Sequence, residues 1–128
     1  MLLIKVKPGI SSIHGLGLFA DQFIAKGTRV WQFSPILDRE IPVQDFVKLS
    51  KLEQEYLLFY GFLSKKSGNY HLSFDNVKFI NHAMPGNIIS DLSAINEIEY
   101  PLIASSDIQP GEELTQNYKD FEVSGHGL

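Results

Sequence analysis

Three segments of the chain carry residue types that could bind a ligand or take part in a reaction. Gly15 and Gly17 flank one residue in a loop, and paired glycines let a backbone approach a ligand closely because no Cβ intervenes. Asn81 and His82 are adjacent and present an amide beside an imidazole. Tyr118 ends a third segment, which begins at a Pro-Gly pair. Together these groups could bind the polar parts of a ligand.

Each segment also has a purely structural interpretation. The two glycines fit a tight turn, because the third glycine and the following helix of a dinucleotide-binding loop are missing. Asn81 and His82 could satisfy buried backbone groups. Tyr118 could be a half-buried core aromatic whose hydroxyl is paired. Taken singly, the three segments therefore do not distinguish a functional site from ordinary packing.

The composition narrows the classes of chemistry. The 128 residues include no cysteine, which excludes disulfides and cysteine-based zinc or iron–sulfur sites. The four histidines, at positions 14, 71, 82 and 126, lack the spacing of a metal site, so we expect no metal. The formal net charge of −4 argues against direct nucleic-acid binding, which needs a basic surface, and is compatible with a lysine-rich partner.

The length fits a single domain over 1–128 with a sizeable core. No apolar stretch approaches the length of a membrane span, and the apolar start of the chain is too short for a signal-peptide core. We therefore expect no membrane partner and a cytoplasmic location, unless an unrecognised route delivers the protein elsewhere.

The elements that must position these groups are mostly short strands. Pro8-Gly9 should end the first strand, and Pro110-Gly111 should form a turn in which the glycine accepts a positive φ. Alternation and short apolar runs predict strands at about 2–6, 18–20, 28–33, 70–74, 101–104 and 113–115.

One helix is predicted over about 50–60. Ser50 and Glu53 have the spacing of a capping box, and Leu52, Tyr56 and Phe59 follow at helical spacing. A weaker helical turn is expected just before it, at 44–49. The helix could form one wall of a substrate groove, or it could simply pack on the sheet through its three apolar side chains.

Two stretches of the chain repeat the same pattern at the same spacing. Each suggests a strand, a short connection, a glycine turn and a second strand. This predicts pseudo-symmetric halves, with chance similarity of two turns as the alternative. The matching residues are Ala20, Ile24, Gly27 and Val30 in the first stretch and Ala104, Ile108, Gly111 and Leu114 in the second.

In their order and spacing, the three segments resemble the SET-domain protein lysine methyltransferases. His14–Ala20 is similar to the opening motif of that family, Asp75–His82 to its central Asn-His motif, and Pro110–Tyr118 to its closing motif. Lys26–Phe33 resembles the second strand of small stand-alone bacterial SET proteins. The resemblance covers about residues 4–121.

The resemblance implies a fold and a reaction. The fold would be mainly β, a β-clip-like SET fold with short curved sheets, a variable helical insert at about 43–68, a C-terminal segment threaded under a loop, and a flexible tail at about 122–128. The reaction would be methyl transfer from S-adenosyl-L-methionine, without a metal, to the side-chain amine of a lysine in a protein or peptide.

The resemblance also implies roles for individual residues. The Gly-x-Gly backbone would hold the methionine end of the cofactor, the Asn-His pair would contact it, and an aromatic beyond the closing motif would cover the adenine. The closing tyrosine, Tyr118, would sit where the methyl group passes and would be the catalytic residue. The cofactor-binding set is Gly15, Leu16, Gly17, Phe79, Asn81, His82, Tyr118 and Phe121.

The chain departs from the family pattern after His82. The family usually has Ser, then Cys or Asp, then x-Pro-Asn, whereas this chain reads Ala-Met-Pro-Gly-Asn over 83–87. Asn117 replaces the usual Asp before the closing tyrosine, and the cysteine-rich zinc module of many relatives is missing.

Two alternatives follow: a catalytically inactive SET-like module that recruits a protein partner, and a methyltransferase that acts on something other than protein lysine. The target lysine, the number of methyl groups added and a homodimer stay open.

Overall fold

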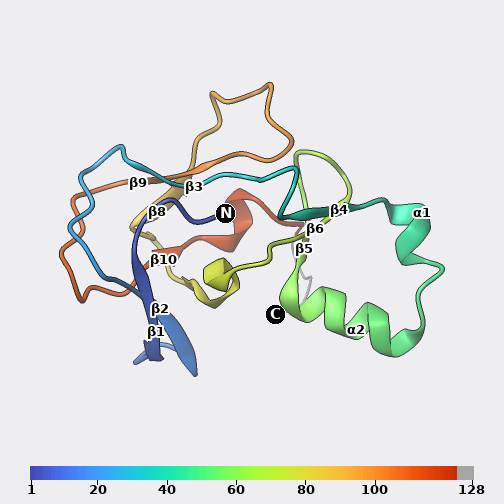
Figure 1. Cartoon of the computed structure of the whole chain (residues 1–128), viewed down its shortest axis with the longest axis horizontal. Coiled ribbons are helices and arrows are strands. Elements are labelled where there is room, and N and C mark those ends of the chain that lie inside the picture. Colours follow the sequence, from blue (N-terminus) through green and yellow to red (C-terminus); the bar gives the residue numbers. More distant parts are fainter. Residues whose placement is uncertain (124–128) are drawn as a thin grey trace.

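Short strands form three small sheets in the computed structural model, which describes residues 1–123 (Figure 1). Strands β1 and β2 form one sheet, β3-β9-β8-β10-β7 a second and β4-β6-β5 a third. The strands are β1 (Val6–Ile10), β2 (Leu16–Ala20), β3 (Arg29–Trp31), β4 (Arg39–Ile41), β5 (Phe62–Leu63), β6 (Tyr70–Leu72), β7 (Asn81–His82), β8 (Ile88–Ser90), β9 (Leu102–Ala104) and β10 (Thr115–Gln116). The predicted mainly β fold of short sheets is therefore confirmed.

The first strand lies later in the chain than predicted. It runs through Pro8 and Gly9, which were expected to end it, and pairs with β2 so that Pro8 faces Leu18. Proline is tolerated because β1 belongs to a two-stranded sheet, where the missing N–H can face away from the partner. The preceding residues instead lie along β3, with the Leu3 N–H donating to Val30 O at 2.9 Å.

The predicted helix is present as α2 (Lys51–Tyr60), after a short α1 (Val43–Phe46). Ser50 closes its N-terminus as expected: its hydroxyl accepts from the Glu53 N–H at 3.1 Å, and the Glu53 carboxylate accepts from the Ser50 N–H at 2.8 Å. The predicted packing stripe is wrong, because Leu52, Tyr56 and Phe59 are all exposed and Leu57 is the buried side chain of α2. Both helices lie at the opposite end of the molecule from β1 and β2 (Figure 1).

The two repeated stretches are related by a pseudo-two-fold arrangement. Ile24 and Ile108 exchange backbone hydrogen bonds of 2.9 and 2.8 Å. The symmetric partner bonds run from Gly27 N–H to Ala104 O at 2.8 Å and from Gly111 N–H to Ala20 O at 2.7 Å. Both glycines have positive φ, of 86° and 90°. The sequence repeat is therefore a structural feature and not a coincidence of two turns.

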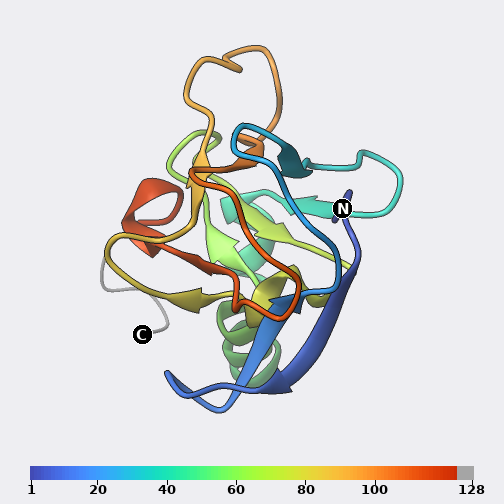
Figure 2. The ribbon, with the colours of Figure 1, turned by 90° about the vertical axis from the view of Figure 1, so that its left-hand side faces the viewer.

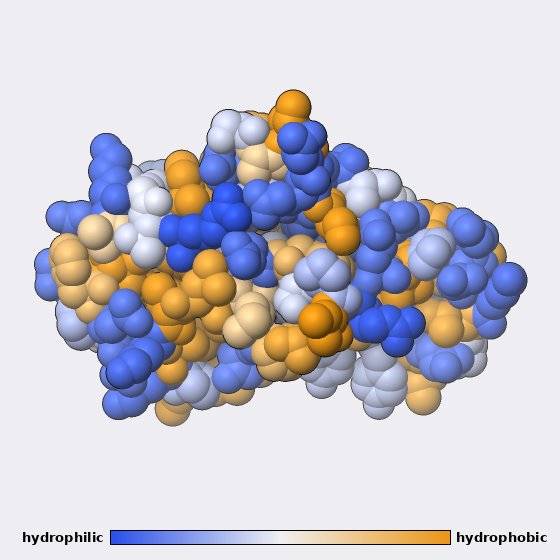
Figure 3. Space-filling view, turned by 45° about the horizontal axis from the view of Figure 1, so that its top comes forward, coloured by the Kyte–Doolittle hydropathy of each residue, from blue (hydrophilic) through white to orange (hydrophobic). Residues whose placement is uncertain are grey.

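The hydrophobic core lies where these two stretches meet the five-stranded sheet β3-β9-β8-β10-β7. Complete burial of a valine, leucine or isoleucine side chain in such a core stabilises a fold by about 1.5–3 kcal/mol. Large apolar side chains also reach the surface, where Figure 3 shows them interspersed with hydrophilic ones. Fully buried core residues include Leu18, Ile24, Val30, Ile80, Ile88, Ile108 and Leu114.

The closing strand is threaded beneath a loop, as the family resemblance implies. β10 lies between β7 and β8 and runs parallel to both, so the 83–87 connection must cross it (Figure 2). At the crossing, a Cβ added to Gly86 would lie 2.5 Å from the Gln116 Cα. Asn87 then clamps the strand, because its Oδ1 accepts from the Thr115 N–H at 2.8 Å and its Nδ2 donates to Glu113 O at 2.9 Å. The altered loop sequence thus still makes the threaded crossing.

The end of the described chain pairs with the segment that follows α2. Glu122 forms a bridge with Ser64, and the Val123 N–H donates to Leu63 O at 3.1 Å. The rest of the predicted tail, 124–128, lies outside the described residues. None of the helices in residues 1–123 has the length and apolar character needed to cross a bilayer.

Candidate functional site

Asn81 ties the glycine loop to the closing segment. Its buried side-chain Nδ2 donates to His14 O at 3.1 Å, to Leu16 O at 3.3 Å and to Glu113 Oε2 at 2.9 Å. A Cβ on Gly17 would lie 2.4 Å from the same Glu113 oxygen, so a side chain at this position would collide with that carboxylate. The fold therefore brings together two segments that the sequence singled out separately.

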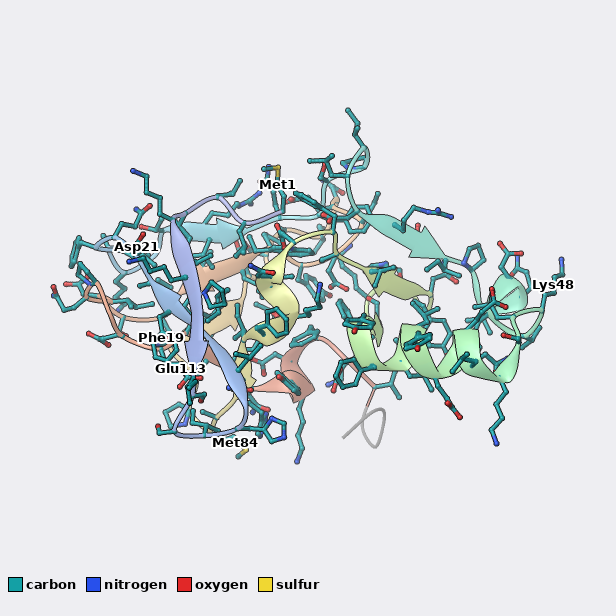
Figure 4. All side chains as sticks on the ribbon, turned by 60° about the horizontal axis from the view of Figure 1, so that its bottom comes forward. Met1, Phe19, Asp21, Lys48, Met84 and Glu113 are labelled. Atoms are coloured by element: carbon teal, nitrogen blue, oxygen red, sulfur yellow. The ribbon has the colours of Figure 1, made fainter. Side chains whose placement is uncertain are left out.

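Glu113 is a site residue that the sequence reasoning missed. It lies next to Phe19 of β2 (Figure 4), and its carboxylate accepts from the Ser11 hydroxyl at 2.8 Å. It therefore anchors both ends of the glycine loop, through Ser11 and through Asn81. The one sequence signal for it was its position in the closing motif.

The backbone and side chain of Tyr118 are both held in place. Its N–H donates to Nδ1 of His82 at 3.1 Å, and the two rings meet edge to face at 5.3 Å. Its hydroxyl donates to Ile80 O at 2.6 Å. Burial, with the nearby Glu122 carboxylate, raises the pKa of Tyr118 to about 12, so the phenol is neutral at physiological pH.

A cavity of about 120 Å³ opens beside Tyr118. Residues 58–60 at the C-terminal end of α2 line it, so the helix forms a wall of the cavity. Its aromatic lining consists of Trp31, Phe59, Tyr60, Phe62, Tyr100, Tyr118 and Phe121. Its polar lining includes His71, Ser73, Lys78, Glu99, Gln116 and Glu122.

The two predicted phenylalanines lie in different surroundings. Phe79 ends a 3₁₀ helix, η1 (Asn76–Phe79), and packs against the core. Phe121 follows a second 3₁₀ helix, η2 (Tyr118–Asp120), and its ring lies 4.8 Å from that of Phe62 and 5.8 Å from that of Tyr118. Phe121 thus lines the cavity, and its contact with the adenine stays a prediction.

The open space beside Gly15 and a free acceptor on Asn81 suit the methionine end of S-adenosyl-L-methionine. Gly15 is exposed with a φ of 43°, and no atom lies within 4 Å of where its Cβ would be. Asn81 Oδ1 receives no hydrogen bond from residues 1–123, so it is free to accept one from an ammonium group. The Glu113 carboxylate adds a negative charge beside this acceptor. The residues present therefore fit a cationic ligand.

Within residues 1–123, no set of three or more His, Asp or Glu side chains is arranged to hold a metal ion.

Comparisons with known proteins identify the family and the fold. The model of the SET domain family matches residues 15–119. A candidate histone methyltransferase of Plasmodium falciparum has the same fold, with a TM-score of 0.62, 20% identity and coverage of 91% of this chain and 95% of that one. No functionally curated protein matches the chain by sequence.

Structures of Polycomb Repressive Complex 2 from Chaetomium thermophilum are also similar. A humanised mutant bound to an inhibitor has a TM-score of 0.65 and 27% identity over 92% of this chain. An autoinhibited form bound to S-adenosylmethionine has a TM-score of 0.64 and 26% identity over 92% of this chain. The chain spans only 15% and 16% of the lengths of these two relatives.

Proposed function

The chain belongs to the SET-domain family, and we propose that it transfers the methyl group of S-adenosyl-L-methionine to the side-chain amine of a protein lysine. The observation that carries this proposal is the position of Tyr118. Its backbone N–H donates a hydrogen bond to the side chain of His82, which is adjacent to Asn81 in the chain. Its ring lines the aromatic cavity. Tyr118 therefore links a surface that suits the cofactor to a cavity that suits a lysine.

The chain's own groups would align the reactants. S-adenosyl-L-methionine supplies a methyl group on a positively charged sulfur. Gly15–Gly17 and Asn81 would hold its methionine end, and His82 would fix Tyr118. Because the Tyr118 hydroxyl donates its hydrogen bond to Ile80 O, the lone pairs of its own oxygen are free to accept an N–H of the amine and orient its nitrogen. Such alignment can supply much of the acceleration of a displacement reaction.

The cavity suits a lysine side chain in shape and charge. Its aromatic walls would pack on the aliphatic stem, and aromatic faces attract a cation. The carboxyl groups of Glu99 and Glu122 also line the cavity. One Polycomb Repressive Complex 2 structure that resembles this chain contains histone H3 with a trimethylated lysine. We therefore propose a lysine-rich, histone-like tail as the substrate class, which the net charge of −4 would attract.

Calorimetry and a transfer assay test the proposal. The wild-type protein should bind S-adenosyl-L-methionine and add methyl groups to a histone H3 tail peptide, detected by mass spectrometry. Tyr118→Phe should bind the cofactor with nearly unchanged affinity but lose about 100-fold or more in turnover, because the amine loses its orienting oxygen. Tyr56→Phe is the matched control, since Tyr56 is exposed, does not line the cavity beside Tyr118 and should behave as wild type.

The outcomes separate the alternatives. A folded protein that binds no S-adenosyl-L-methionine would identify the chain as an inactive SET-like module that recruits a partner. Cofactor binding with transfer only to small amines or other acceptors would favour a non-protein substrate. Wild-type turnover by Tyr118→Phe would refute the role of Tyr118.

A further inference from the structure

Two carboxylates line the cavity, and only one of them has partners. Glu99 Oε1 accepts from the Ser64 hydroxyl at 2.6 Å and lies 3.0 Å from His71 Nδ1. Its Oε2 accepts from the Tyr100 N–H at 2.8 Å. Both oxygens of Glu99 are thus engaged in structural contacts.

Glu122 differs from Glu99 in this respect. It is only 7% exposed, yet no residue among 1–123 gives its carboxylate a hydrogen bond or an ion pair. Its backbone is fixed, because its N–H donates to Tyr118 O at 3.1 Å and it forms a bridge with Ser64. A buried and unpaired carboxylate destabilises a fold. In the wall of the cavity, Glu122 therefore presents a carboxylate that a cationic ligand could pair with.

Two lysines in this part of the molecule, Lys78 in the cavity lining and Lys65 beside Ser64, make other contacts. Lys78 Nζ donates to Asp75 O at 3.4 Å and lies over the rings of Tyr60 and Phe79, at 5.3 and 5.5 Å. Lys65 Nζ donates to Lys119 O. The other titratable groups that line the cavity are Tyr60, His71, Glu99, Tyr100 and Tyr118.

Building on the proposed methyl transfer, we propose that Glu122 binds the ammonium of the substrate lysine in this cavity and accepts its proton before the methyl group is transferred. In this step an N–H bond of the ammonium breaks, its electron pair stays on nitrogen, and the proton forms an O–H bond with the Glu122 carboxylate. The neutral amine then has the lone pair that attack requires. Glu122 returns the proton to water when the product leaves.

The protonation states of the neighbours support this assignment. A lysine has an ordinary pKa of about 10.4, so at neutral pH almost all of it carries the extra proton. Tyr118 does not take that proton, because its pKa of about 12 keeps it a neutral phenol whose hydroxyl donates to Ile80 O. Burial raises the pKa of Glu122 to about 7, which makes it a stronger base than an exposed carboxylate while leaving much of it ionised at neutral pH.

The pH dependence of kcat/KM for the histone H3 tail peptide tests the inference in wild type and Glu122→Gln. The wild-type value should rise with pH up to about 7, as Glu122 ionises, and then level off. Glu122→Gln should instead keep rising with the fraction of free amine. The variant should be about 100-fold slower near pH 8, and the gap should shrink toward pH 10. Superimposable profiles would overturn the inference.

Two further variants serve as controls. Glu55→Gln removes a carboxylate from the exposed face of α2 and should keep the wild-type profile. Glu122→Asp retains a carboxylate and should recover the rise below pH 7 at a reduced rate. Melting curves of each variant exclude misfolding as the cause of a change.

A second readout does not need turnover. In carbon-13 labelled protein, the carboxyl resonance that disappears in Glu122→Gln should titrate near pH 7, and n-butylamine, as a probe of the lysine side chain, should lower that midpoint. If that resonance titrates at the midpoint of exposed glutamates and does not respond to n-butylamine, the role of Glu122 is overturned but the proposed methyl transfer is not. An n-butylamine response in a protein that binds no S-adenosyl-L-methionine would overturn the proposed methyl transfer and the proton step, and leave an ammonium-binding site.

Discussion

Gly86 is the position where the loop crosses the threaded strand with no room for a side chain. A Cβ added there would lie 2.5 Å from the Gln116 Cα, 2.6 Å from Thr115 O and 2.9 Å from the Gln116 N. All three are backbone atoms, so no rotation of a side chain can relieve the contact. Gly86→Ala must therefore push the 83–87 loop away from β10.

The cost follows from what holds the crossing together. Overpacking of this kind destabilises a fold by about 1–3 kcal/mol. Separation also weakens three hydrogen bonds, each worth about 1 kcal/mol. These run from Ala83 N–H to Gln116 O at 3.1 Å, from Thr115 N–H to Asn87 Oδ1 at 2.8 Å and from Asn87 Nδ2 to Glu113 O at 2.9 Å. We expect Gly86→Ala to lower the free energy of unfolding by about 3–5 kcal/mol.

Differential scanning calorimetry measures this effect directly. For a domain of this size, the expected loss lowers Tm by roughly 10–20 °C. Gly27→Ala is the comparison, because Gly27 has a φ of 86° but no atom within 4 Å of its Cβ position. It should cost only about 1 kcal/mol of backbone strain. A fall in Tm for Gly86→Ala that is no larger than that for Gly27→Ala would refute the reasoning about the crossing.

Two further predictions concern the site. His82→Ala leaves the Tyr118 N–H without its acceptor at 3.1 Å, so calorimetry should show about tenfold weaker binding of S-adenosyl-L-methionine, and an unchanged affinity would contradict the role of His82. Glu122 makes stability depend on pH. Its pKa is raised from 4.5 to about 7, so its contribution to stability is complete below pH 4.5 and is lost as pH rises to about 7, by up to about 3 kcal/mol. Urea unfolding should show this decline in wild type and its disappearance in Glu122→Gln. Parallel stability curves for the two proteins would argue against a buried charge at this position.

Features set by neighbours along the chain could be predicted from the sequence. The capping box of Ser50 and Glu53 is an example, because both partners lie within one helical turn and make the two expected hydrogen bonds. The glycine turns at Gly27 and Gly111 are another, since a positive φ is a local property of the backbone. The three motifs, read in order, also predicted the family that the comparisons confirm.

Burial and register could not be predicted in the same way, because they depend on what packs against an element. Tyr56 and Phe59 have the spacing of a packing stripe, yet α2 meets the protein through Leu57. The first strand can run through Pro8 because each strand of a two-stranded sheet has one open edge, where no N–H is needed for pairing.

The chemistry of the site divides along the same line. The sequence by itself determined the residue types, namely a glycine pair, an Asn-His pair and a tyrosine, and the order in which they occur. The tertiary structure alone decided that Glu113 joins the first two and that Glu122 enters the wall of the cavity beside Tyr118. Glu122 reaches this place because its segment pairs with Ser64, far earlier in the chain. A contact of that kind depends on the path of the whole backbone, which no local pattern encodes.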